Sequence, residues 1–332
     1  MDLAGQRFVV IGGAGLIGSH TVDLLLEYDV AQINVFDDFS RGTHENLTSA
    51  LRDPRVKIFE AGGNICHRDI LGAALTNADG VFHFAALWLL QCADFPRAAF
   101  DVNVAGFFNV LEACVEKHVR RLVFSSSASV YGDAVEEPMT EDHPHNNQNF
   151  YGATKIADEA LARAMHYRFN LAYVGLRYMN VYGPRQDYRG AYVAVIMRML
   201  DAIANCHPLH IHGDGTQSYD FVYVKDCAHA NILAMKAKAT DRFYNVGTGI
   251  KTSLNSLANT LLRLTESTLG IIHDESRTSF VNNRVGSTGR AHEEIGFEAQ
   301  TGLEEGLRSL IAWHAADRSV HPQRKLTASG AF

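Results

Sequence analysis

The sequence predicts an α/β fold in which a doubly wound parallel sheet is accompanied by a smaller α+β domain. Three observations lead to this prediction: short β-branched runs alternate with segments of helical periodicity, a glycine-rich turn follows the first run, and the alternation becomes irregular after about residue 177. Alternating strands and helices form mostly parallel sheets that are covered on both faces. With 332 residues, the chain is long enough for two domains.

The strands of the sheet are expected where short apolar runs occur, at residues 8–11, 33–36, 56–59, 81–84, 122–125 and 172–176. Helical patterns lie between them, most clearly at 98–118 and 151–169. Later in the chain we expect loops at 182–190 and 213–218, helices near 191–204 and 252–265, and sheet-like segments at 221–224 and 243–246. Residues 1–177 would form the first domain, with a segment near 220–250 returning to it, and residues 178–332 the smaller one.

Composition excludes several classes of protein. The hydrophobic share of 47% and the charged share of 20% are ordinary for a soluble globular protein. A formal charge of −7 has the wrong sign for a protein whose main partner is nucleic acid. The five cysteines form no C-x-x-C pair, and neither a signal pattern nor a long apolar run is seen. We therefore expect a cytoplasmic protein with no nucleic-acid or membrane partner.

A metal site is not expected. His207, His210 and His212 could place two imidazoles on one face of a strand. No acidic or cysteine residue is spaced along the sequence to complete the ligand set.

The glycine-rich turn predicts dinucleotide binding. Gly12, Gly15 and Gly18 lie between the first strand and the first helix, where glycine lets the backbone approach a pyrophosphate at a helix N-terminus. Asp37 follows at the end of the second strand, where a carboxylate can bind the adenosine ribose. The same carboxylate would repel a 2′-phosphate, so the expected cofactor is NAD, although Arg41 lies close enough to soften that preference. The first domain is therefore expected to be a Rossmann domain.

Tyr151 and Lys155 are candidates for catalysis. They lie four residues apart, on one face of an expected helix, which taken alone is also the spacing of an ordinary surface pair. Ser127 closes the strand at 122–125, and ligands of doubly wound sheets bind at the carboxyl ends of strands. This topology places Ser127 opposite Tyr151.

Motifs along nearly the whole chain resemble those of the extended short-chain dehydrogenase/reductase family, in particular its NAD-dependent sugar-nucleotide epimerase/dehydratase group. They read G-G-A-G-L-I-G-S-H, D-D-F-S-R-G, H-F-A-A-L, Y-G-A-T-K, L-R-Y-M-N-V-Y-G-P-R-Q, G-D-G-T-Q-S-Y-D-F-V-Y-V and Y-N-V-G-T-G, with a serine stretch before Tyr151. The resemblance implies a Ser-Tyr-Lys site. Tyr151 would act as the base, Lys155 would favour the phenolate and bind the nicotinamide ribose, and Ser127 would hydrogen-bond to the reacting oxygen.

The resemblance also implies the residues that bind the cofactor. Asn64 stands where an adenine-binding aspartate is common, and its amide oxygen can still accept a hydrogen bond. Trp88 either walls the nicotinamide pocket or is a core residue. The full expected set is Gly12, Gly15, Leu16, Ile17, Gly18, Asp37, Asp38, Ser40, Arg41, Asn64, Ile65, Ala85, Ala86, Asn103, Tyr151, Lys155 and Tyr178.

The residues after Ser127 bear on the reaction. Ala128 and Ser129 occupy the place where 4,6-dehydratases of this group carry an Asp-Glu pair, and neither the glutamate of decarboxylases nor the cysteine of 3,5-epimerases is present. The resemblance thus points to 4-epimerisation, as in UDP-glucose/UDP-galactose 4-epimerase. A net oxidoreductase or dehydratase and a catalytically silent NAD-binding sensor or scaffold remain alternatives. The family also implies a homodimer, formed through the helix at 98–118 and the helix that follows Tyr151.

The expected substrate is a nucleotide sugar, bound by Ser127, Asn180, Tyr219, Arg277 and Arg284. Asn180 and Arg277 match family positions that contact the diphosphate. Tyr219 departs from the pattern, because the epimerases usually have arginine there. Arg284 either replaces that missing cation or pairs with a carboxylate on the substrate.

Overall fold

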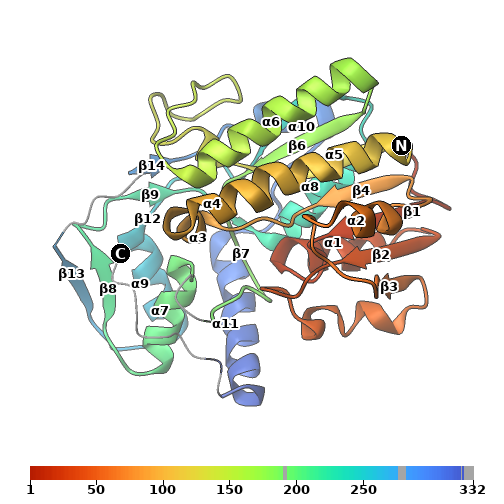
Figure 1. Ribbon diagram of the computed structural model, residues 1–332. Coiled ribbons are helices and arrows are strands. Elements are labelled where there is room, and N and C mark those ends of the chain that lie inside the picture. Colours follow the sequence, from red (N-terminus) through yellow and green to blue (C-terminus); the bar gives the residue numbers. More distant parts are fainter. Residues whose placement is uncertain (190–192, 276–281, 323, 325–332) are drawn as a thin grey trace.

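A seven-stranded parallel sheet forms the centre of the computed structural model, which describes residues 1–189, 193–275, 282–322 and 324 (Figure 1). The strand order is β3-β2-β1-β4-β5-β6-β11, and every neighbouring pair is parallel. The doubly wound α/β fold is therefore confirmed. The strands are β1 (Arg7–Ile11), β2 (Gln32–Phe36), β3 (Val56–Ile58), β4 (Gly80–His83), β5 (Arg121–Ser127), β6 (Tyr173–Tyr178) and β11 (Arg242–Val246).

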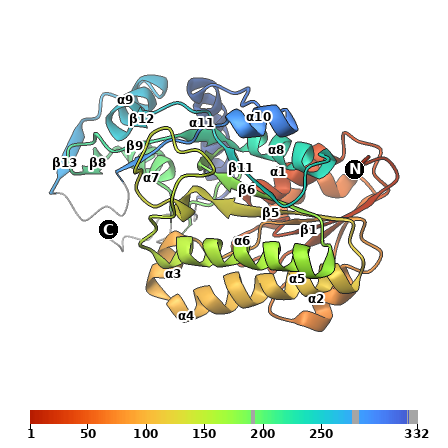
Figure 2. The ribbon, with the colours of Figure 1, turned by 90° about the horizontal axis from the view of Figure 1, so that it is seen from above.

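Helices cover both faces of the sheet (Figure 2). Successive side chains of a strand point to opposite faces, and accordingly Val9 and Ile11 of β1 pack in one core while Phe8 and Val10 pack in another. The first face is covered by α2 (Arg68–Ala74), α5 (Phe107–Glu116) and α6 (Phe150–Phe169), and the second by α1 (Leu16–Leu25), α8 (Val224–Lys236) and α10 (Gly289–Ile295). Short 3-10 turns η1 (His44–Leu47), η2 (Ala50–Arg52) and η4 (Ala128–Val130) join these elements.

Two late segments complete this sheet and its cover. The strand β11 pairs with β6, and α8 packs against α1, although both follow segments that lie outside the sheet. The segment expected to be sheet-like up to residue 224 divides into β10 (Phe221–Tyr223) and the start of α8. The strand β10 pairs with β7 (Asn180–Tyr182) and not with the large sheet.

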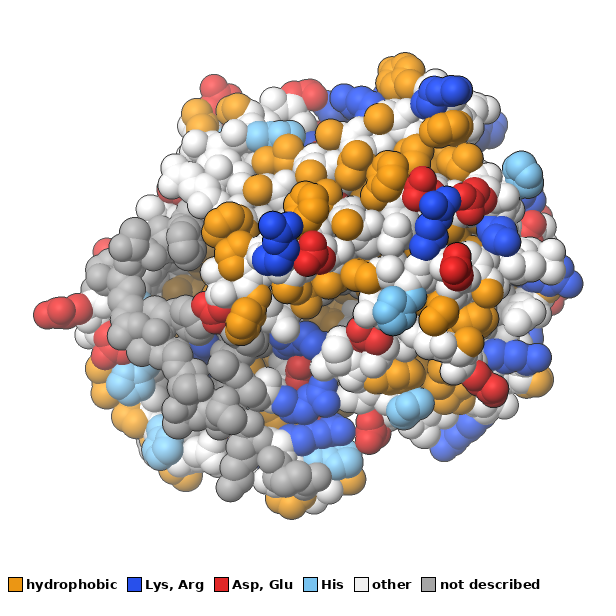
Figure 3. All heavy atoms as spheres, viewed as in Figure 1, with side chains coloured by type: hydrophobic (Ala, Val, Ile, Leu, Met, Phe, Trp, Pro, Cys, Tyr) orange, Lys and Arg blue, Asp and Glu red, His pale blue; other side chains and the backbone are white. Residues whose placement is uncertain are grey.

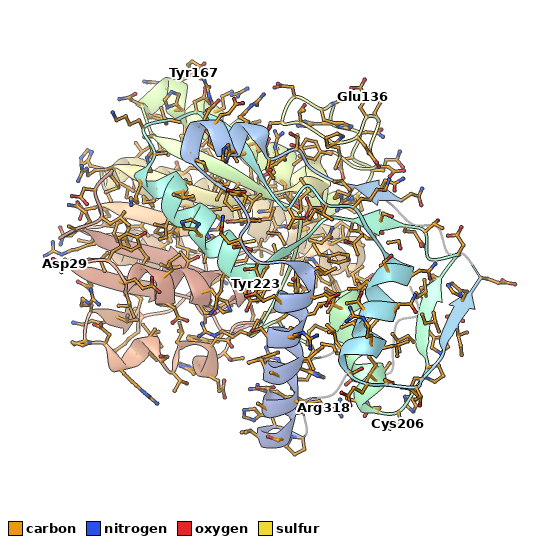
Figure 4. The ribbon with its side chains drawn as sticks, turned by 180° about the vertical axis from the view of Figure 1, so that it is seen from behind. Asp29, Glu136, Tyr167, Cys206, Tyr223 and Arg318 are labelled. Atoms are coloured by element: carbon orange, nitrogen blue, oxygen red, sulfur yellow. The ribbon has the colours of Figure 1, made fainter. Side chains whose placement is uncertain are left out.

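The rest of the chain forms a smaller α+β unit with its own core. Tyr223, which is labelled in Figure 4, hydrogen-bonds through its hydroxyl to Ser309 of α11 at 2.9 Å. Arg318, near the far end of the same helix, donates to Asp201 of α7 at 2.7 Å. The helices of this unit are α7 (Val195–Ala204), α9 (Leu254–Leu264) and α11 (Leu303–Val320), and its short strands are β8 (Leu209–His212), β9 (Ser218–Tyr219), β12 (Thr252–Ser253), β13 (Ile271–Asp274) and β14 (Asn283–Arg284).

One continuous helical run, Pro96–Glu116, is long and apolar enough by length and composition to cross a membrane. It consists of α4 (Pro96–Ala99), a π-helical segment η3 (Phe100–Gly106) and α5, and it follows α3 (Leu89–Asp94). Its inner side packs against α2 and α6. Core helices of soluble proteins pass the same test of length and composition, and the contacts with α2 and α6 make this run part of the sheet's cover.

Candidate active site

The glycine turn between β1 and α1 can pack this tightly only because side chains are absent. Gly12 has φ +76°, and a Cβ atom there would lie 2.6 Å from the backbone nitrogen of Ala85. A Cβ atom on Gly18 would lie 2.1 Å from the carbonyl oxygen of Gly12. Gly15 is the residue before α1, and no side chain caps that helix N-terminus. Free backbone N–H groups and the helix dipole there suit a pyrophosphate.

Asp37 lies at the end of β2, next to this turn. One carboxylate oxygen accepts from the backbone N–H of Ala14 at 2.8 Å, and the other accepts from that of Phe39 at 2.8 Å. Burial raises the pKa of Asp37, whereas the two N–H groups act in the opposite direction. The carboxylate is thereby held beside the glycine turn, where the ribose of a dinucleotide would lie.

Ser127, Tyr151 and Lys155 are brought together from two elements. Ser127 ends β5 and accepts from the N–H of Ser129 at 3.1 Å, and α6 begins at Phe150 because the Asn149 side chain caps the N–H of Gly152 at 2.8 Å. The Lys155 ammonium lies 5.9 Å from the centre of the Tyr151 ring. Lost hydration raises the pKa of Tyr151, while the charge of Lys155 and a hydrogen bond with Ser127 lower it. The resting phenol is therefore protonated but has its activating groups in place.

Lys155 is buried and has a partner that the sequence reasoning missed. Its Nζ donates to the carbonyl of Ser125 at 3.0 Å and to Oδ2 of Asp158 at 3.2 Å. Burial disfavours the ammonium, but Asp158 and Tyr151 outweigh this effect and raise the pKa of Lys155. Burial raises the pKa of Asp158 to about 7, against the pull of Lys155. The spacing of three residues on one helix is a local signal that could have revealed this pair.

A second buried pair anchors α6 to the sheet beside the site. Glu159 accepts from Nε of Arg177 at 2.8 Å, from Nη2 at 2.7 Å and from the hydroxyl of Ser126 at 2.5 Å. Arg177 also donates to the carbonyl of Glu141 at 2.8 Å. These bonds fix β5, β6 and α6 relative to one another, and thus fix the distance between Ser127 and Tyr151.

A cavity of about 450 Å³ connects the glycine turn with the serine and tyrosine. This volume lies within the range of small-molecule sites. The expected site residues that line it are Gly12, Gly15, Leu16, Ile17, Gly18, Arg41, Ala86, Ser127, Tyr151, Tyr178, Asn180 and Arg284. A larger hollow of about 680 Å³ lies beyond α6, along β11 and α10, and is lined mainly by charged side chains that pair with one another. We place the site in the smaller cavity because the glycine turn, Ser127 and Tyr151 all meet there.

Other expected site residues do not line the cavity and make hydrogen bonds within the protein. Asn103 accepts from the N–H of Leu87 at 2.7 Å and donates to its carbonyl at 3.1 Å, which holds the loop after β4. Asn64 accepts from the N–H of Cys66 at 2.9 Å, and Asp38 accepts from that of Ser40 at 3.0 Å. The expected residues that do not line the cavity are Asp37, Asp38, Ser40, Asn64, Ile65, Ala85, Asn103, Lys155 and Tyr219, and Arg277 lies outside the described residues.

Trp88 lines the cavity, which favours its interpretation as a wall of the nicotinamide pocket over a core role. The guanidinium of Arg41 lies 6.0 Å from the centre of its indole ring. Arg41 also pairs with Asp187 at 3.0 Å, and Asp187 in turn pairs with Arg189 at 2.7 Å. Arg185 lines the cavity as well, and it was not expected from the sequence.

The histidines of β8 do have an acidic neighbour, contrary to the expectation from sequence spacing. Pairing of β13 with β8 brings Asp274 within 2.9 Å of Nδ1 of His210 and 3.9 Å of Nδ1 of His212. Within the part of the chain that the structure describes, no group of three or more His, Cys, Asp or Glu side chains could hold a metal ion. The contact between His210 and Asp274 is a surface pair.

The family model for the NAD dependent epimerase/dehydratase family matches residues 8–247. The chain belongs to this family. Its cofactor is accordingly NAD, and the glycine turn, Asp37 and the cavity described above fit that cofactor.

Relatives of this family member include enzymes of different reaction types. It is 32% identical to a UDP-glucose 4-epimerase of Mycolicibacterium smegmatis, over 92% of this chain and 97% of that one. It is 29% identical to a dTDP-glucose 4,6-dehydratase of an Actinoplanes species, over 95% and 99% of the two chains. The chain is also similar to a solved structure, that of a UDP-N-acetylglucosamine 4-epimerase of Methanobrevibacter ruminantium M1 in complex with UDP-N-acetylmuramic acid. The TM-score is 0.89 and the identity is 31%, over 95% of this chain and 99% of that one. The resemblance to the extended short-chain dehydrogenase/reductase family is thereby confirmed.

Proposed function

We propose that this protein is an NAD-dependent sugar-nucleotide 4-epimerase. One observation carries the proposal: the cavity combines Ser127 and Tyr151 with a scarcity of other acid–base groups. Among the described residues that line it, Asp187 is the one carboxylate, and there is no cysteine. Asp187 is already paired with Arg41 and Arg189.

The chain's own residues would act on the hydroxyl at C4 of the sugar. Tyr151 takes the proton of this hydroxyl, Ser127 hydrogen-bonds to the same oxygen, and Lys155 stabilises the phenolate that Tyr151 becomes. NAD, when bound, would supply a reversible acceptor for the hydride of C4. After the 4-keto sugar turns over in the cavity, Tyr151 gives the proton back to the oxygen. The configuration at C4 is inverted, and no net oxidation occurs.

Dehydration requires further groups that the described residues of this site do not offer. A 4,6-dehydratase must remove a proton from C5 and protonate the departing hydroxyl at C6, which calls for an additional acid and base. Ala128 and Ser129 follow Ser127 here, and Ala128 is buried. The names of the relatives include both epimerases and a dehydratase, and they therefore do not decide between the two reactions. The residues of the cavity favour the epimerase.

The proposal is tested by incubating the purified protein with UDP-, GDP-, CDP- and dTDP-sugars. An epimer of unchanged mass without accumulation of NADH is expected. Loss of water would instead show a dehydratase, stoichiometric NADH a net oxidoreductase, and bound NAD without turnover of any sugar a sensor or scaffold. Tyr151→Phe should retain NAD but lose turnover by about 100-fold or more, since a general acid–base group is removed. Unchanged activity of this variant would contradict the mechanism.

We further propose that the protein is a homodimer formed through α4, η3, α5 and α6. The continuous run of α4, η3 and α5 lies beside α6 (Figure 1), and hydrophobic side chains gather over this face (Figure 3). Phe95, Phe100, Phe108 and Phe150 are 58%, 51%, 36% and 56% exposed. An apolar patch of this kind on a soluble protein is typical of an interface. Sedimentation analysis should show a dimer that Phe100→Glu converts to a monomer, and a wild-type monomer would refute this proposal.

A further inference from the structure

The cavity contains a buried arginine, Arg284, that forms no salt bridge with any residue the structure describes. Pairing of β14 with β9 places Arg284 beside Tyr219. The Arg284 side chain lines the cavity together with Tyr151, and its Nε atom is buried without a hydrogen bond to any described residue. A buried guanidinium nitrogen in this situation is costly, because the described residues do not replace the hydrogen bond to water that it has lost. A ligand that brings a negative charge would remove that cost.

The carboxylates nearest to this arginine are already engaged. Asp133 is close enough to interact with Arg284 electrostatically, but one of its oxygens accepts from the N–H groups of both Asn282 and Asn283 at 2.9 Å. Asp187, which also lines the cavity, belongs to a pair with Arg41. The anion that Arg284 needs therefore has to come from the ligand.

The place of Arg284 indicates which part of the ligand it meets. Burial lowers the pKa of Arg284, and Tyr219 and Tyr151 are the groups that oppose this effect most. Tyr151 acts at C4 of the sugar in the function proposed above. In a nucleotide sugar the diphosphate is attached at C1, across the ring from C4. A cation near Tyr151 is therefore better placed for a substituent on C3 or C5, the carbons that flank C4, than for the diphosphate.

We propose that Arg284 binds a carboxylate carried by the sugar on a carbon next to C4, so that the substrate is a nucleotide-activated sugar acid. This inference rests on the proposed 4-epimerase function for the position of the sugar. The planar guanidinium can donate two parallel hydrogen bonds to a carboxylate, and both are strengthened by burial. A neutral hexose would leave the guanidinium without an ionic partner in the cavity and would bind more weakly.

Binding is measured in NAD-loaded Tyr151→Phe protein, in which turnover does not consume the ligand. Isothermal titration with UDP, dTDP, GDP and CDP first selects the nucleotide that binds most tightly. Its glucose form, its glucuronate form with a carboxylate on C5, and its N-acetylmuramate form with a carboxylate linked at C3 are then compared. At least one of the two acids should bind about 10-fold or more tightly than the glucose form, as expected for one buried charge-assisted pair.

Arg284→Met keeps the length of the side chain but removes its charge. In the same background it should weaken the preferred acid by about 10- to 100-fold and change the affinity for the free nucleotide and the glucose form by less than about 3-fold. Arg284→Lys should restore part of the loss, which shows that the charge matters and that the site is intact. Equal weakening of all three ligands would mean that Arg284 binds the diphosphate, which would overturn the proposal. Equal binding of the acids and the hexose to the Tyr151→Phe protein would overturn it as well.

Turnover of the preferred acid by wild-type protein separates the two proposals. An epimer of unchanged mass supports both. Oxidation at C4 of a glucuronate produces a β-keto acid, which can lose carbon dioxide. Tight binding that depends on Arg284, followed by release of carbon dioxide, would support the carboxylate site and refute the 4-epimerase.

Discussion

Removing the charge of Lys155 should shift the titration of Tyr151 by an amount that the structure determines. The ammonium lies 5.9 Å from the centre of the tyrosine ring. Over this distance, an effective dielectric constant of about 20 gives a Coulomb energy of about 3 kcal/mol, which corresponds to about 2 pKa units. Lys155→Met should therefore move the acidic limb of the kcat profile about 2 pH units upward, and activity at neutral pH should fall about 100-fold.

The assay is the pH dependence of kcat with a nucleotide sugar that the wild-type protein converts, and the NAD retained by each sample is measured in parallel. Because Lys155→Met leaves Asp158 without its cation, the double variant Lys155→Met/Asp158→Asn provides the matched control. Asp158 itself raises the pKa of Tyr151, so the double variant should show a smaller shift than the single one. An acidic limb that stays within about half a pH unit of wild type, with NAD still bound, would refute the electrostatic role assigned to Lys155.

Three further variants test other parts of the site. Glu159→Gln removes the charged partner of buried Arg177, which should lower the free energy of unfolding by about 3–5 kcal/mol. In a chain of this size that loss corresponds to a decrease in Tm of about 4–7 °C in calorimetry. A decrease below about 1 °C would contradict the stabilising role of this pair. Asp158→Asn should flatten the pH dependence of stability. Burial raises the pKa of Asp158 from 3.8 to about 7, so the stabilisation from its protonation is complete below pH 3.8 and is lost as pH rises through about 7. Denaturant titrations across that interval should show a smaller decline in the free energy of unfolding for the variant than for wild type. Gly18→Ala would place a Cβ atom 2.1 Å from the carbonyl oxygen of Gly12, so the purified variant should contain no NAD; retention of the wild-type amount would argue against a tight turn.

The sequence was sufficient where the signal is local. Strands of the large sheet were predicted close to their observed ends because buried parallel strands are short apolar runs between turns. The pair of Tyr151 and Lys155 was found by helical spacing, and the same spacing could have revealed Asp158. Contacts between segments that are distant in the sequence produce no local pattern from which they could be predicted. The burial of Arg284 depends on the pairing of two-residue strands β9 and β14, and the approach of Asp274 to His210 depends on the pairing of β8 with β13.

The order in which the chain builds its sheet has a consequence for synthesis on the ribosome. When residue 177 has emerged, β6 has no neighbour on its outer side, because β11 ends at Val246, and α1 has no cover, because α8 ends at Lys236. An open strand edge and a bare apolar helix face are both prone to association with other chains. The large sheet therefore cannot reach its final form before about three quarters of the polypeptide has been translated. A nascent chain that is stalled before that point should be a client for chaperones.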